Sequence, residues 1–347
     1  MTSRCHTPRS ITGAMLAAST VLGPALVGLV PLTAATLQPS AAVEQDRGRS
    51  PRDTPPAATD AERDVRVLTL GPTGFLELKT PSGDISVVAG SGRDVRIEIL
   101  KRPRGRSADE VRRSLESAEV MVDHQGERAS VVAMVRGDRR GNNTRADVSF
   151  HVTAPAGTRI SAHATSGHVT IRDIKGEIAA EVTSGNIAIT NAGSVSLART
   201  ISGNITLNNI AGKGDLTVGS VSGVVLADRV TAEHVDIDVA SGSITARDVT
   251  ATRATVRTLS GTVDFSGRLI KGGRYEFVSH SGNVRVATDG AGYVLQANSF
   301  SGSIHPDASL GLKAVTVNPR SFRGTAGDGS ATVVATTFSG NISLSRR

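Results

Sequence analysis

Apolar and polar residues alternate in short runs along most of the chain, and many of these runs end at a Ser-Gly dyad. Before Ser241, for example, the apolar positions are Val235, Ile237 and Val239, and aspartates stand between them. Successive side chains of a β-strand point to opposite faces, so a period of two predicts a half-buried strand. A second alternating run follows most dyads. The pattern therefore predicts pairs of short strands joined at the dyads.

The alternation changes phase by one residue at the dyad. Up to Ser184 the apolar positions are even-numbered, whereas after Gly185 they are Ile187 and Ile189. A one-residue slip would turn every later side chain to the opposite face unless the backbone bends there. Glycine accepts the dihedral angles of a bend, and serine is small. We therefore expect each dyad to be a corner whose serine points inward, where stacked serines hydrogen-bond along the axis.

Asparagine, aspartate and arginine recur six residues after the dyad glycines, where the second strand of each pair ends. Asn and Asp side chains bond to the nearby backbone and so favour turns. This predicts a second corner in each repeat, which carries a ladder of Asx turns and salt bridges. The positions are Asp173, Asn191, Asn209, Arg229 and Asp248.

The dyads recur about every 19 residues, a period that indicates stacked repeats rather than one globular core. Two strands and two corners per repeat predict an all-β fold, a parallel β-solenoid (β-helix). We expect about ten coils over about 45–50 Å, with right-handed winding because parallel crossovers have that hand. The dyad serines of the array are Ser166, Ser184, Ser202, Ser222, Ser241, Ser260, Ser281, Ser301 and Ser339.

An earlier dyad at Ser82 stands apart from this array, and its surroundings predict an N-terminal cap. Strand-like runs flank a helix candidate over 108–118, which Ser107 precedes as a capping residue. The first coil of a solenoid exposes open strand edges, which need a cover. We therefore expect residues 64–158 to form a β-rich capping segment with one short helix, and residues 159–347 to form the solenoid.

The N-terminus has the layout of a secretory signal. A basic start precedes an uncharged run from Ser10 to Val43, so we expect residues 1–42 to be a signal peptide. Residues 43–63 are rich in Pro, Ala, Asp and Arg and predict a disordered linker. The alternative is an uncleaved membrane anchor, since the run is long enough to span a bilayer. The single cysteine, Cys5, precedes the run, so the exported part has no disulfide.

The chain is basic, with 39 Lys and Arg against 32 Asp and Glu, a net charge of +7 and a pI near 10.1. This balance favours contact with an anionic surface, and the alternative is a solvated face that keeps a Gly-rich protein soluble. Nucleic acid is a poor partner for a chain with 3% aromatic residues and no Trp. The candidate contact residues are Arg102, Arg104, Arg106, Arg112 and Arg113.

The best candidates for catalysis are the carboxylates Glu233, Asp236 and Asp238, because polysaccharide lyases and glycosidases on β-helices cluster such groups in one groove. A carbohydrate-active enzyme is therefore the main alternative function. Aspartates on an exposed strand, however, are typical devices against aggregation, and the missing Trp removes the usual platform for sugar rings. We expect no enzyme activity, no catalytic residue and no cofactor.

Metal-binding and nucleophilic sites have weaker support still. His151, His163 and His168 lie near each other in the sequence but lack a fixed ligand spacing, so they are expected to be surface histidines and no metal site is predicted. No histidine recurs with the dyad serines, so these serines are not expected to be nucleophiles.

The residue before the dyad serine is apolar in much of the array. The alternation turns this position outward, which predicts an exposed apolar stripe for a protein partner, a homotypic contact or docking of the cap. The alternative is that the corner turns these side chains into the core. The stripe consists of Ile201, Val221, Ala240, Leu259, Phe300 and Phe338.

Residues 183–187, 201–205 and 338–342 each read x-Ser-Gly-Asn-Ile, and residues 154–158 read Ala-Pro-Ala-Gly-Thr. This pattern resembles the bacterial β-strand-repeat family of unknown function labelled "putative adhesin", over about residues 65–344. The resemblance implies the solenoid fold and carries no catalytic residues.

We therefore expect an exported, non-catalytic scaffold of the bacterial envelope, periplasm or cell exterior that acts in adhesion, with no transmembrane segment once the signal is cleaved. Its partner would be a protein or an anionic envelope polymer. Besides the enzyme, a second alternative is an envelope-stress sensor whose basic cap binds anionic polymer or lipid.

Overall fold

The computed structural model describes residues 61–136 and 146–347, which belong to one compact unit. The predicted signal peptide, residues 1–42, lies outside the described residues, as does the predicted linker up to residue 60. The described part is all-β, rich in parallel pairing and solenoid-like, with a single α-helix. No helix within these two ranges is long and apolar enough to cross a membrane.

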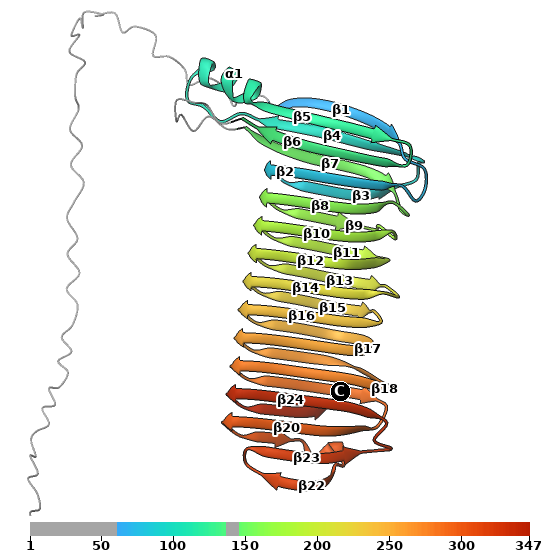
Figure 1. Ribbon diagram of the computed structural model, residues 1–347, viewed down its shortest axis with the longest axis vertical. Helices are drawn as coiled ribbons and strands as arrows, with labels where there is room; N and C mark the ends of the chain where they lie inside the picture. The colour runs from blue at the N-terminus through green and yellow to red at the C-terminus, as the bar shows by residue number, and fades with distance from the viewer. Residues whose placement is uncertain (1–60, 137–145) are drawn as a thin grey trace, which may run out of the picture. The chain divides into compact units, whose positions relative to one another are not determined.

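Each repeat places one strand before its dyad and one after it, and equivalent strands of successive repeats pair in parallel (Figure 1). The strands that end at a dyad are β8 (Arg159–Ser166), β10 (Glu177–Ser184), β12 (Ser194–Ser202), β14 (Asp215–Ser222) and β16 (His234–Ser241). The strands that follow are β9 (Val169–Arg172), β11 (Ile187–Ala192), β13 (Ile205–Ala211), β15 (Val225–Thr231) and β19 (Val284–Gly290). Two long strands, β17 (Ile244–Ser260) and β18 (Val263–Ser281), run through the second corner and serve both sides.

The pairing aligns the repeats residue by residue, so the dyad serines form one line along the stack. Inward side chains two and four residues before each serine fill the centre of the stack. Val218 and Ile237 are examples, and each is at most 1% exposed. Phe265 and Phe277 pack against each other in this core, and their ring centroids lie 4.7 Å apart. Burial of these rows is the main stabilising contribution, because no disulfide links the described residues.

The dyad is a corner, as the phase change predicts. At Gly223 the φ angle is +153°, and a Cβ there would lie 1.9 Å from the carbonyl oxygen of Gly203 in the preceding repeat. Only glycine fits, because the backbone conformation disfavours a side chain and because the stacked backbones leave no room for one.

The prediction that the dyad serines point inward is wrong. Ser184 and its counterparts from Ser166 to Ser339 are exposed. The ladder skips the residue before each serine, so that residue and the serine both face outward. The inward hydroxyls stand two residues earlier: Thr200 Oγ1 donates to the Gly185 carbonyl at 3.1 Å, and Ser279 Oγ to that of Gly261 at 3.1 Å.

The second corner is also where the sequence predicts it. The five predicted turn residues, from Asp173 to Asp248, have left-handed φ angles of 53° to 63°. The Asn209 amide donates to Asn191 Oδ1 at 2.8 Å, and the Asn191 amide donates to Asp173 Oδ1 at 3.0 Å. These bonds form the predicted ladder of turns, which offsets the strain of the left-handed residues.

At the N-terminal end, the Ser82 dyad belongs to the stack itself. Its strands pair in parallel with β8 and β9 on one side and with a further strand pair on the other. The stack therefore continues past the predicted boundary at residues 158 and 159. Its strands here are β2 (Phe75–Ser82), β3 (Ile85–Gly90), β6 (Arg128–Val135) and β7 (Asp147–Pro155).

Three antiparallel strands cover the open edges at this end. They are β1 (Glu62–Thr69), which starts inside the last residues of the predicted linker, β4 (Asp94–Arg102) and β5 (Ala118–Gln125). The predicted helix is α1 (Ala108–Ser117), capped by Ser107, whose hydroxyl accepts from the Glu110 N–H at 3.3 Å.

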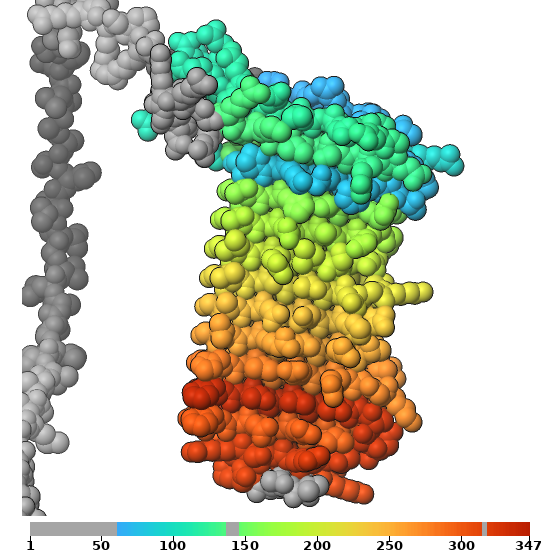
Figure 2. Space-filling view, in the orientation of Figure 1, coloured from blue at the N-terminus to red at the C-terminus, as the bar shows by residue number. Residues whose placement is uncertain are grey.

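At the C-terminal end, the last repeat of the chain lies inside the stack. Its strands β24 (Ala331–Ser339) and β25 (Ile342–Arg346) pair with β18 and β19 on one side. On the other side they pair with the preceding repeat, β20 (Tyr293–Ser301) and β21 (Ile304–Pro306). In Figure 2 the dark red layer of these last residues accordingly lies between orange layers.

A short 3-10 helix, η1 (Ala308–Leu310), and an antiparallel hairpin follow β21 in the chain. The hairpin strands are β22 (Lys313–Asn318) and β23 (Ser321–Ala326), and β23 pairs with the free edge of β20. Both ends of the stack are thus covered by antiparallel strands, which blocks uncontrolled pairing with other chains.

Candidate functional site

An exposed apolar stripe follows the line of Ser-Gly corners. The predicted stripe side chains face outward: Leu259 is 62% and Phe300 67% exposed, Ile201, Val221 and Phe338 are about half exposed, and the small Ala240 is partly buried. The pairing adds His280 to this row and gives the order Ile201, Val221, Ala240, Leu259, His280, Phe338 and Phe300. Neighbours in such a row are about 4.8 Å apart. We call these seven residues the stripe.

The stripe ends in a stack of three rings. The rings of Phe300 and Phe338 lie 4.6 Å apart at 6°, and those of Phe338 and His280 lie 4.9 Å apart at 11°. Phe338 stands between the other two because β24 lies between β18 and β20. The insertion of the last repeat therefore creates the largest exposed apolar group of the stripe.

A row of mostly charged residues runs parallel to the stripe, three residues before each serine. In stack order it reads Lys79, His163, Glu181, Arg199, Gly219, Asp238 and Arg257. We call it the charged row. Its members project from the same outward face of the strands as the stripe.

A shallow groove of about 500 Å³ separates the stripe from the charged row between β12 and β18. Its floor includes the inward hydroxyl residues Thr200, Ser220 and Thr258, and its walls are largely apolar. At Gly219 a Cβ would lie 3.4 Å from Arg199 Nε, so the Arg199 side chain lies close over this position. The groove is open to solvent, which suits an extended contact rather than an enclosed small molecule.

The predicted carboxylate cluster only partly comes together. Asp236 and Asp238 lie on β16 and face the same side, whereas Glu233 precedes the strand. Partial burial, and then repulsion from Asp236, raise the pKa of Asp238, and the positive charges of Arg257 and Arg199 oppose the shift. Asp236 Oδ1 is buried and has no hydrogen-bond partner among the described residues. A carbohydrate-active enzyme on this fold would use a pair of carboxylates such as Asp236 and Asp238.

A hydrogen-bonded chain of three side chains on β8 and β10 was not predicted from the sequence. His163 Nε2 lies 2.9 Å from Ser161 Oγ, and His163 Nδ1 lies 3.1 Å from a carboxylate oxygen of Glu181. The order of groups is that of a hydrolytic triad. All three residues are partly exposed, on the outward face of β8 and β10.

The family model described as Toastrack DUF4097 matches residues 76–345, most of the chain. The chain belongs to this family. The match spans the stack from β2 to β25, so the Toastrack domain includes the stripe, the charged row and both terminal repeats.

The Toastrack chain is similar to solved structures at low identity. A "putative lipid binding protein" of Parabacteroides distasonis has 13% identity and a TM-score of 0.43, over 82% of this chain and 96% of that one. A "putative adhesin" of Bacteroides fragilis has 12% identity and a TM-score of 0.39, over 82% and 97%. A "putative cell adhesion protein" of Clostridium sporogenes has 10% identity and a TM-score of 0.26, over 83% and 100%. No curated protein matches the chain.

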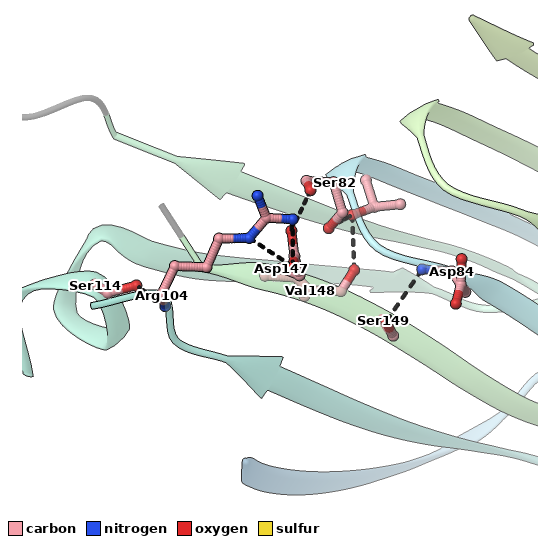
Figure 3. Close-up of polar contacts among 8 residues, drawn as sticks. Ser82, Asp84, Arg104, Ser114, Asp147, Val148 and Ser149 are labelled. Atoms are coloured by element: carbon pink, nitrogen blue, oxygen red, sulfur yellow. Dashed lines mark hydrogen bonds and ion pairs between the residues drawn. The ribbon is translucent and has the colours of Figure 1, made fainter. Parts of the chain in front are cut away.

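All five predicted basic contact residues are exposed, and two of them, Arg104 and Arg112, form ion pairs within the chain. Arg104 binds Asp147 at the start of β7 through two hydrogen bonds of 2.9 Å, and the same carboxylate accepts from Ser82 (Figure 3). Arg112 lies 3.8 Å from both Asp109 and Glu116 within α1. The other three are Arg102, Arg106 and Arg113.

The contacts of Arg104 fix the segment after β4 to the stack. Its backbone N–H also donates to Ser114 Oγ at 3.0 Å, which joins α1 to the same point. A guanidinium that donates two hydrogen bonds to one carboxylate is held in a fixed orientation, so Arg104 has a structural role. Because Arg104 is already paired with Asp147, Arg102, Arg106 and Arg113 are better placed to contact an anionic surface.

Among residues 61–136 and 146–347, no group of three or more His, Cys, Asp or Glu side chains is placed to hold a metal ion. His168 Nδ1 accepts from the backbone N–H of Asn186 at 3.1 Å, as part of a ladder beside the dyads. His151 lies on β7, apart from this ladder.

Proposed function

We propose that the chain is an exported, non-catalytic interaction scaffold of the bacterial cell envelope, built on a right-handed β-solenoid of about ten coils. Residues 1–42 would direct its export and residues 43–63 would separate its folded body from the membrane. Attachment to another envelope component, as in adhesion, is the function that this fold and its exposed face support best.

The observation that carries the proposal is the exposure of the stripe. Soluble proteins rarely leave a contiguous apolar row exposed unless it is an interaction surface. Burial of a half-exposed Leu, Ile or Phe contributes roughly 1 kcal/mol, so one row member alone binds weakly. The rigid stack presents several members at a fixed spacing, and a partner that contacts them together gains the sum without ordering a flexible surface.

The experiment is co-sedimentation of the purified chain with an envelope fraction of the bacterium that encodes it. The test variant replaces Leu259, Phe300 and Phe338 by Ser. The control replaces Val224 and Leu226 by Ser, since these exposed apolar residues stand after the corner, just before and within β15, and so outside the stripe. The proposal predicts that the test variant loses most of its binding and that the control retains it. Equal binding by both would refute it.

The non-catalytic part of the proposal has its own test. The chain is incubated with anionic polysaccharides, and the products are compared with those of a variant that carries Asp236→Ala and Asp238→Ala. We expect no cleavage by either protein. Cleavage that the substitutions abolish would establish the carbohydrate-active alternative, because these are the paired carboxylates that such chemistry needs.

A further inference from the structure

We propose that the face with the stripe and the charged row binds the same face of a second copy of this chain, in an antiparallel dimer centred on β14. The inference rests on the proposed function, because it names a partner for the same interaction face. A dimer of identical surfaces needs a face that is complementary to itself under a two-fold rotation. The charged row has this property.

The signs of the charged row reverse about Gly219. One strand to either side stand Arg199 and Asp238, and two strands to either side stand Glu181 and Arg257. A two-fold axis that runs parallel to β14, in the plane between the two copies, reverses the order of the strands in the second copy. Each row of one copy then lies opposite the same row of the other copy. Arg199 then faces Asp238 of the second copy, and Glu181 faces Arg257. Each contact occurs twice by symmetry, which gives four pairs of opposite charge.

Gly219 lies where the axis would cross the charged row. A residue at this point faces its own copy, so a charged side chain there would meet a like charge. Glycine is the one uncharged residue of the row between Glu181 and Arg257.

The stripe supplies an apolar row along one edge of the same contact. Val221 lies on the axis and meets its own copy, and Ile201 meets Ala240 on the strands to either side. Both Ile201 and Val221 are about half exposed in the single chain.

The starts of the strands limit the width of the contact. Arg159 of β8 and Arg274 of β18 would face each other there, and their like charges repel. Contact is therefore favoured only over the five residues of each strand that come directly before the dyad serine, the last of which belongs to the stripe. Over the seven strands from β8 to β18 these positions cover about 480 Å² per copy, close to the lower limit for a specific interface. The dimer is therefore weak, reversible and sensitive to salt.

The test is sedimentation velocity of the full chain from about 1 to 100 µM, the range that suits a weak dimer. We expect Arg199→Asp or Asp238→Arg alone to weaken the dimer about tenfold or more, because each places like charges opposite each other twice. The double variant with both substitutions exchanges the two charges and should restore the wild-type affinity. Arg285→Asp, at an exposed site on β19, is the control and should have no effect.

A second measurement locates the axis. In a chain with Cys5→Ser, which removes the only native cysteine, Val221→Cys should form a disulfide between copies under oxidation, and Val224→Cys should not. A wild-type chain that stays monomeric at the highest concentration, or a double variant without rescue, would overturn the inference. If the monomeric chain still binds envelopes through Phe300 and Phe338, the proposed function stands while this inference fails.

Discussion

The stacking of glycine corners makes a strong prediction for Gly223→Ala in the middle of the array. The native φ of +153° lies in a region that L-residues avoid. The new Cβ would lie 1.9 Å from the Gly203 carbonyl oxygen and 2.7 Å from its carbon. These are backbone atoms of the neighbouring repeat and cannot rotate away, so the overlap can be relieved only by separation of the two repeats.

The expected loss of unfolding free energy has two parts. The backbone conformation alone costs about 1–2 kcal/mol for a residue with a side chain. Separation of the repeats also breaks the bond from Gly203 N–H to the Ser222 carbonyl, 3.0 Å, and that from Val224 N–H to Asn204 Oδ1, 2.9 Å. At about 1 kcal/mol each, these bonds bring the total to about 3–4 kcal/mol.

Two other glycines separate the causes in a urea titration followed by far-UV circular dichroism, the suitable probe for a chain without Trp. Gly126 has φ of +58° and no heavy atom within 4 Å of a Cβ, so alanine there bears only the backbone term. Gly214 has free space and no positive φ, so alanine there should be close to neutral. If Gly223→Ala were no more destabilising than Gly126→Ala, the account of the stacked corners would be refuted.

Three further predictions concern other contacts of the stack. Hydrogen bonds from Lys79 and then from Ser130 lower the pKa of Glu77, so its ionised form stabilises the fold at neutral pH and this stabilisation is lost as the pH falls through the lowered pKa. Glu77→Gln should therefore be about 0.5–1 kcal/mol less stable at pH 7, and the difference should vanish in acid unfolding titrations. Asn209→Ala should lose about 1–2 kcal/mol and Asn209→Gly less than about 1, since only alanine strains the left-handed turn; equal losses in thermal melts would contradict this reading. Deletion of β24 and β25 should make the C-terminal repeats sensitive to limited proteolysis while the N-terminal half stays resistant, because repeats stabilise mainly their neighbours.

The corners were predictable from the sequence because each has a local requirement that only certain residues meet. The phase change after Ser184 identifies the first corner, and the polar residue at Asn191 identifies the second. The inward direction of the serine was not predictable in this way. Strict alternation would turn every second residue inward, including the dyad serine. At the bend, however, two consecutive residues face outward, as Thr183 and Ser184 do. The buried hydroxyl therefore stands two residues before the serine, as Thr200 does before Ser202.

The order of the terminal repeats is a second feature that the sequence did not reveal. The dyads at Ser281, Ser301 and Ser339 are equivalent, so nothing local shows that the last one lies between the other two. Strand pairing here depends on which edges the rest of the chain leaves open. The ring stack of Phe300 and Phe338 follows from this pairing and was hidden for the same reason.

The stripe was predicted as outward from the alternation, and the structure places its side chains outside. The charged row and the bonds of His163 with Ser161 and Glu181 were missed. Alignment of the repeats on their serines would have found both. In that alignment Glu181 stands beside His163, and Arg199 and Asp238 stand on either side of Gly219. Only the bond distances needed the structure.

The most direct test of the central claim is hydroxyl-radical footprinting of the chain with and without an envelope fraction. The account predicts that binding protects Leu259, Phe300 and Phe338 from oxidation while Val224 and Leu226 react at their unbound rates. Protection of the second pair with no change along the stripe would show that the chain binds through another face and would contradict the account.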